Sequence, residues 1–180
     1  GQGAHDDGAG CAQVLEALRL LRERSLVPRR TLRVVLFMNE ENGLAGAKAY
    51  LAAHEGELER HVLALESDRG GFTPRGFTTN GPDEMKSLLV GAATLLAPLG
   101  ASAIVNGGGG ADIAELAKHG VPLVGYMPDS QRYFDHHHCE RDRLESVHPR
   151  ELELGAAAIA ALAYMLADYP EDLPRLASKE

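Results

Sequence analysis

The 180-residue sequence predicts an α/β fold with three layers, in which helices cover both faces of a mainly parallel, mixed central sheet. One observation supports this fold class, and a second supports a single domain. Short apolar runs alternate along the chain with longer segments whose apolar residues recur at helical spacing, which is the order typical of βα units. The length is that of one ordinary domain with enough residues for a sizeable core. We therefore expect a single domain over residues 1–180.

The first half of the chain is expected to contain two helices and two strands. An amphipathic helix is predicted over residues 11–24, and a buried strand over residues 31–38. A second helix follows at residues 44–54, and residues 61–68 form the second predicted strand. Residues 70–81 are rich in Gly, Thr and Pro, which indicates a loop or a short edge hairpin.

The second half continues the same alternation. A helix is predicted over residues 82–97, with Pro suited to its first turn, and a short strand over residues 101–105. A compact helix should begin at Asp112 as its N-cap and end before Gly120. A strand over residues 121–126 and a long Ala-rich helix over residues 149–167 complete the pattern.

Composition excludes several classes of protein. The formal net charge is −8 and no basic stripe is visible, which argues against binding to nucleic acid. No apolar run approaches the length needed to span a membrane. Cys11 and Cys139 are too few for a disulfide framework, so one bridge or two free thiols remain open.

Acidic and imidazole side chains follow the ends of several predicted strands or precede a helix. Because the C-terminal ends of parallel strands meet at one edge of a sheet, such groups can lie together there. Carboxylates and imidazoles are zinc ligands, and a bridging carboxylate can join two metals. A further Glu can take a proton from metal-bound water. The side chains placed in this way are Asp6, Asp7, Glu40, Glu41, Asp68, His136, His137 and His138.

Each of these groups also has a structural interpretation. Glu40 and Glu41 taken alone would most often be a solvated pair. Asp6 and Asp7 could simply cap the helix that follows them, and Asp68 could simply end a strand in a turn. The His cluster alone is equally compatible with a solvated loop. Only the four groups together favour a metal site.

Four motifs, in the order in which they occur, resemble those of the di-zinc exopeptidases of peptidase family M28. Two further stretches, Glu66–Phe72 and Gly108–Ile113, are similar to the glutamate-carboxypeptidase (Q-type) branch of that family. The resemblance covers nearly the whole chain and implies the zinc-exopeptidase version of the α/β fold. The four motifs are Asp6–Gly10, Arg33–Leu44, Glu66–Asp68 and Tyr133–His138.

The resemblance implies a role for each matching residue. Asp6 corresponds to the carboxylate that bridges two zinc ions. Glu41 and His138 correspond to ligands of one zinc ion, and Asp68 to a ligand of the other. The implied reaction is hydrolysis of dipeptides or short peptides by a metal-activated water.

The implied catalytic groups are Glu40 and His137. Glu40 matches the general base, and His137 stands where the family often has a Tyr that stabilises the oxyanion. Asp112 and Tyr133 are expected on the substrate side of the site. The resemblance leaves open whether the enzyme is an aminopeptidase or a carboxypeptidase.

Two departures from the family pattern affect these expectations. Cys139 follows the ligand His where a Thr is usual. The family's first His ligand lies upstream of the residue that matches Asp6, so we expect the chain to be a fragment shortened at its N-terminus. Such a fragment should hold one zinc ion at most and have little or no peptidase activity. Exposed apolar surface should then favour association, including a homodimer.

Other functions and the cellular location stay open from the sequence alone. A non-catalytic interaction domain and a single-zinc, aminoacylase-like amidohydrolase are the alternatives to the exopeptidase. The family resemblance favours a secreted or periplasmic protein.

Overall fold

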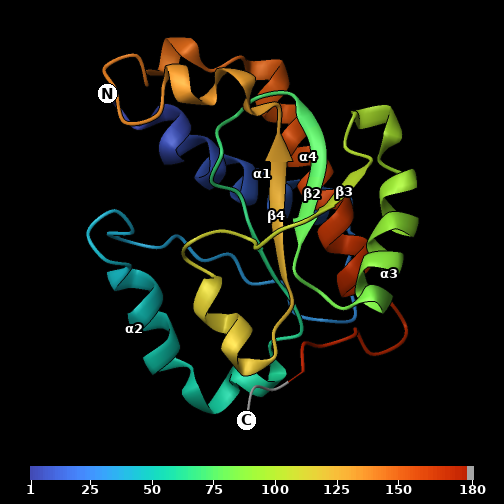
Figure 1. The fold of residues 1–180 in the computed structure, drawn as a ribbon. Helices are drawn as coiled ribbons and strands as arrows, with labels where there is room; N and C mark the ends of the chain where they lie inside the picture. The colour runs from blue at the N-terminus through green and yellow to red at the C-terminus, as the bar shows by residue number, and fades with distance from the viewer. Residues whose placement is uncertain (178–180) are drawn as a thin grey trace.

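The computed structural model describes residues 1–177 and is built around a four-stranded sheet (Figure 1). The strand order is β1-β4-β2-β3. Strand β1 runs parallel to β4, β2 runs parallel to β3, and β2 and β4 are antiparallel, so the sheet is mixed as predicted. The strands are β1 (Ala64–Glu66), β2 (Pro74–Thr79), β3 (Ala103–Asn106) and β4 (Leu123–Pro128).

Within residues 1–177, four α-helices and several short helical turns surround the sheet. Helices α1 and α4 pack against each other, and α3 packs on β3 (Figure 1). The α-helices are α1 (Ala9–Glu23), α2 (Ala45–Ala53), α3 (Asp83–Thr94) and α4 (Pro149–Ala167). The shorter turns are Ala4–Gly8, Glu55–Arg60, Ala97–Leu99, Ala114–His119, Ser130–Asp135 and Leu144–Ser146. No helix within residues 1–177 is both long and apolar enough to cross a membrane.

The core lies on both faces of the sheet. Successive side chains of a strand point to opposite faces, and β4 shows this directly. Val124 packs with residues of α1, α3 and α4, whereas Leu123 packs with a smaller cluster that includes Leu58 and Leu116. Two layers of helix therefore enclose the sheet, which agrees with the predicted three-layer fold.

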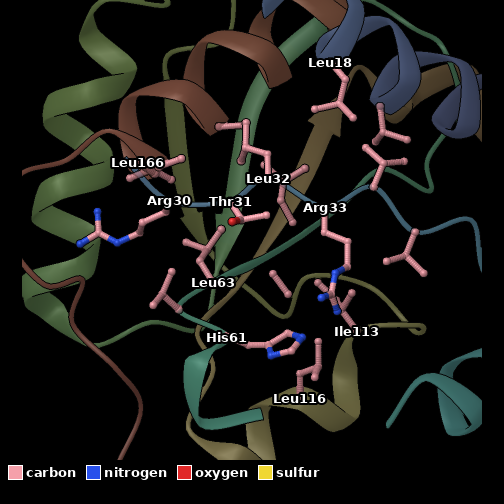
Figure 2. Close-up of a pocket in the computed structure, with 18 of the residues that line it drawn as sticks. Leu18, Arg30, Thr31, Leu32, Arg33, His61, Leu63, Ile113, Leu116 and Leu166 are labelled. Carbon is pink, nitrogen blue, oxygen red and sulfur yellow. The ribbon is translucent and has the colours of Figure 1, made fainter. Parts of the chain in front are cut away.

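The predicted strand over residues 31–38 is wrong. Within residues 1–177 this segment forms no ladder with another strand. A groove of about 560 Å³ separates it from β1, and apolar side chains such as Leu32 and Leu63 line that groove (Figure 2). An apolar run becomes a strand only when a partner backbone lies beside it. None of the side chains that line the groove is a candidate site residue.

The prediction for residues 70–81 also needs correction. They contain β2, which lies between β4 and β3 inside the sheet rather than at its edge. Phe77 is fully buried in this strand. Gly76 has φ +157°, and a Cβ there would overlap the carbonyl of Ala103 on β3. Gly76, part of the Gly content that suggested a loop, thus permits close strand pairing.

The four long helices are confirmed, with ends that differ from prediction by a few residues. The compact helix expected from Asp112 is instead a short 3₁₀ turn, Ala114–His119, and no side chain among residues 1–177 caps it. Both Cys11 and Cys139 are free thiols in the described part of the chain.

Candidate metal centre

The candidate site lies where the N-terminal loop meets the loop that follows β4 (Figure 1). The backbone N–H of Gln2 donates to the carbonyl of Asp142 at 2.6 Å, so the two loops are joined although they are far apart in sequence. Strands β1 and β4 are parallel, and both end at this side of the sheet. Their C-terminal ends therefore bring acidic and imidazole groups to one rim.

The His-rich loop has a defined local structure. The Asp129 side chain accepts a hydrogen bond from the N–H of Gln131 at 3.2 Å and so caps the turn Ser130–Asp135. The carbonyl of Tyr133 accepts from the N–H of His137 at 2.9 Å. His138 follows with φ +54°, the left-handed conformation. Both imidazoles approach Asp6 of the N-terminal loop.

Asp6, His137 and His138 form the centre of the site. Nε2 of His138 lies 3.2 Å from Oδ2 of Asp6, and Nε2 of His137 lies 3.7 Å from the same oxygen. The two imidazole rings stack with centroids 3.7 Å apart. One ligand atom from each of the three residues lies within 4.8 Å of the others. These three residues could therefore hold a metal ion.

Glu41 approaches the same imidazole from the loop before α2. Its Oε1 lies 2.6 Å from Nε2 of His138, and both side chains are about half exposed. Ligand atoms about 2.0–2.1 Å from a tetrahedral zinc ion are roughly 3.3 Å from one another. The 3.2 Å separation of Asp6 and His138 matches that value, whereas Glu41 and His138, 2.6 Å apart, must move apart to share a metal. The donor set therefore fits zinc.

Asp68 belongs to a second group of carboxyls beside the first. Burial raises the pKa of Asp68 to about 7, and the charges of Glu66, Asp6 and Glu40 add to the increase. Burial and the charge of Glu40 raise the pKa of Asp112 to about 6. The charge of Glu40 thus acts on both residues. Asp68 is not part of the compact group that combines imidazole with carboxylate within residues 1–177.

Carboxyl groups are concentrated throughout this rim. Burial raises the pKa of Asp7 to about 8, and the nearby charge of Asp68 contributes. Burial also raises the pKa of Asp6, while the imidazole of His137 acts in the opposite direction. Crowded carboxyls hold protons when no cation is present, and a bound metal reverses that preference.

This crowding predicts how the stability of the metal-free chain depends on pH. The pKa values of Asp7 and Asp68 are raised above the value of about 3.9 expected for an unfolded Asp. Between pH 4 and 8 the folded chain therefore binds more protons than the unfolded chain, and stability falls as pH rises. Urea unfolding in EDTA should give a lower free energy of unfolding at pH 8 than at pH 5.

Asp7→Asn should reduce this pH dependence. Its amide oxygen can still accept the hydrogen bond that Asp7 receives from the N–H of Gly10 at 3.0 Å. Asp83→Asn is the matched control, because the Asp83 side chain is 97% exposed. Stability that rises between pH 5 and 8, or equal slopes for Asp7→Asn and the parent chain, would contradict this explanation.

The remaining predicted residues lie around the centre. Tyr133 is 8% exposed, and its ring packs against that of His137 with centroids 4.9 Å apart. Burial and the charge of Asp6 raise the pKa of Tyr133. Glu40 is half-buried on the same loop as Glu41. The structure thus brings Asp6 and Glu41 to the imidazole of His138, and places His137 beside Asp6 with Tyr133 packed against its ring.

Sequence reasoning missed two carboxylates that support the site. Oε2 of Glu66 accepts the N–H of Ile113 at 3.0 Å and so holds the loop that carries Asp112. Glu66 lies two residues before Asp68, so in an extended chain the two side chains point to the same face. That spacing of two acids was a usable signal in the sequence. Asp142 is 3% exposed and accepts the N–H of Asp6 at 3.1 Å. No sequence feature distinguishes it from the other acids of its loop.

Comparison with known proteins gives consistent matches over nearly the whole chain. A family model described as peptidase family M28 matches residues 1–163. Carboxypeptidase Q of Rattus norvegicus is 37% identical over 175 residues, which are 97% of this chain and 37% of the relative. The chain therefore spans little more than a third of the length of that relative.

Solved structures agree with these matches. A peptidase M28 precursor from Shewanella amazonensis SB2B superposes with a TM-score of 0.91 at 37% identity, covering 98% of this chain and 40% of that one. The zinc aminopeptidase BSAP from Bacillus subtilis superposes with a TM-score of 0.68 at 20% identity, covering 97% of this chain and 45% of that one. The second similarity establishes the fold alone.

Proposed function

The chain belongs to peptidase family M28, and we propose that it carries the catalytic centre of a zinc-dependent exopeptidase acting on dipeptides or short peptides. One observation carries this proposal: Asp6 and Glu41, from two separate loops, both approach Nε2 of His138. A third acid, Glu40, lies on the same loop as Glu41 and is not needed as a ligand. Metal-assisted hydrolysis needs metal ligands together with such a free carboxylate.

Asp6, Glu41 and His138 would hold the zinc ion. Asp6 is the least exposed of the three, with 13% of its side chain accessible, so it is the most firmly placed. When bound, zinc polarises a carbonyl group and lowers the pKa of its bound water towards neutrality. We propose Asp68 as a ligand of a second metal position that shares Asp6.

Glu40 would act as the general base. It would take a proton from the attacking water and pass it to the amine that leaves when the peptide bond breaks. Its placement supports this role, because its charge acts on Asp68 and Asp112 while Glu41 on the same loop reaches the imidazole of His138. A general base beside the ligands can reach a water at the metal without itself competing for the metal ion.

His137 would donate a hydrogen bond to the carbonyl oxygen of the substrate as that oxygen gains negative charge. Its Nε2 lies 3.7 Å from Asp6, so it is at the metal centre without a short contact to a carboxylate. We place Asp112 and Tyr133 on the substrate side. Tyr133 would act mainly by fixing the ring of His137, since it is buried.

The metal content of residues 1–180 alone should be lower than that of a complete di-zinc centre. The group around Asp68 consists of carboxyls, whereas the group around Asp6 includes imidazoles. We therefore propose that this polypeptide binds one zinc ion tightly and turns over peptides poorly. A single-zinc amidohydrolase is the second candidate function, because one imidazole-containing group suffices for it.

Two further proposals concern the setting of the protein. A secreted or periplasmic location is supported by the similarity to a Shewanella amazonensis protein described as a precursor. Self-association, including a homodimer, is supported by the apolar groove between residues 31–37 and β1.

Hydrolysis of dipeptides by the complete protein tests the proposed function. Unblocked dipeptides should be cleaved, cleavage should stop when zinc is chelated, and added zinc should restore it. Blocking either the amino or the carboxyl end of the peptide then decides between an aminopeptidase and a carboxypeptidase. Absence of turnover by the zinc-loaded complete protein would contradict the proposal.

A further inference from the structure

A buried carboxylate joins the two loops that supply the central metal ligands. Oδ1 of Asp142 accepts the backbone N–H of His5 at 2.6 Å, and Oδ2 accepts the N–H of Asp6 at 3.1 Å. Asp142 is only 3% exposed. Both oxygens of one side chain are thus used to hold the backbone on which Asp6 is mounted.

The same residue is fixed to the His138 loop. Asp142 lies four residues after His138, and its own N–H donates to the carbonyl of Cys139 at 3.2 Å. Its carbonyl accepts the N–H of Gln2 at 2.6 Å, and the N–H of Leu144 donates to Oε1 of Gln2 at 3.0 Å. The loops therefore cannot slide past each other without breaking hydrogen bonds at Asp142.

We propose that Asp142 is a positioning residue that sets the distance between the carboxylate of Asp6 and the imidazole of His138, and thereby the affinity for zinc. This inference rests on the proposed function, because it concerns the same site. Asp142 itself would touch neither metal nor substrate. It acts through Asp6, as outer partners of metal ligands commonly do.

A carboxylate is the side chain that this task requires. It accepts two hydrogen bonds and donates none, whereas an amide would turn its NH₂ group towards one of the two N–H donors. A second negative charge beside Asp6 is unfavourable in the metal-free chain, since like charges repel. The same charge becomes favourable when a cation is bound. A residue that only joined the two loops would not need a charge.

Zinc titration of the 180-residue chain by calorimetry tests the inference. Asp142→Asn should weaken zinc binding about 10- to 100-fold, the range found when an outer partner of a ligand is removed. Asp83→Asn, at an exposed position of α3, should bind zinc as the parent chain does. Cobalt at saturating concentration adds a spectroscopic readout. The ligand-field spectrum of Asp142→Asn should move towards that of Asp6→Asn, because the Asp6 carboxylate is displaced in both.

The outcomes separate this inference from the proposed function. Unchanged zinc affinity and an unchanged cobalt spectrum in Asp142→Asn would overturn the positioning role and leave the metal site intact. Failure of the parent chain to bind zinc would overturn the proposed function, and the positioning role with it.

A second measurement applies even if Asp142→Asn does not fold. In the parent chain the amide protons of His5 and Asp6 should exchange slowly with solvent, because the Asp142 carboxylate holds them. Exchange of these two amides at the rate of unprotected backbone would overturn the inference.

Discussion

Glu40→Gln should lower kcat for dipeptide hydrolysis by the complete zinc-loaded protein about 10²- to 10⁴-fold, the usual contribution of a general base. The amide cannot accept the proton of the attacking water at neutral pH. It keeps the size of the side chain, so the loop between residues 38 and 45 should retain its hydrogen bonds. KM should change little, because the substrate still binds beside the intact ligands.

Two measurements accompany this prediction. Zinc content should stay at the parent level in Glu40→Gln, which separates loss of the base from loss of the metal. Glu23→Gln serves as the matched control, since Glu23 is exposed on α1 and pairs with Arg19. Turnover of Glu40→Gln at the parent rate would refute the assignment of Glu40 as the base.

Asp6→Asn should weaken zinc binding to the 180-residue chain by more than about a hundredfold. Loss of an outer partner of a ligand already costs about 10- to 100-fold, and Asp6 would touch the metal directly. The amide keeps the shape of the side chain and removes its charge. Calorimetric titration measures the effect, and the parent chain should show one tight equivalent of zinc.

Two further variants show whether the ligands are assigned correctly. Asp68→Asn should affect that tight equivalent less than Asp6→Asn does, because Asp68 lies outside the imidazole-containing group. His137→Phe should leave zinc affinity close to the parent value if His137 donates to the substrate. A loss as large as that of Asp6→Asn would make His137 a metal ligand instead, and two tight equivalents in the parent chain would contradict the single-site proposal.

The family and the long helices could be predicted from the sequence because each depends on local pattern. Helices α1 and α4 have apolar residues at helical spacing, which periodicity alone identifies. The motif resemblance, including that to the Q-type branch, is confirmed by the family match and by the identity to Carboxypeptidase Q.

The elements that prediction missed depend on partners elsewhere in the chain. Residues 31–38 have the composition of a strand, yet pairing is decided by the backbone beside them. Strand β2 was hidden because Pro74 and Gly76 resemble loop residues until the approach of β3 is known. For the same reason the sequence offered no sign of Asp142, whose importance comes from hydrogen bonds to His5 and Asp6 across the fold.

Anomalous scattering at the zinc edge from zinc-soaked crystals of the 180-residue chain tests the central claim most directly. We predict one strong peak within bonding distance of Asp6, Glu41 and His138, with the hydrogen bond between Glu41 and His138 opened to admit the ion. A crystal without a peak at this rim, or with zinc bound only by unrelated side chains, would contradict the assignment of the metal centre.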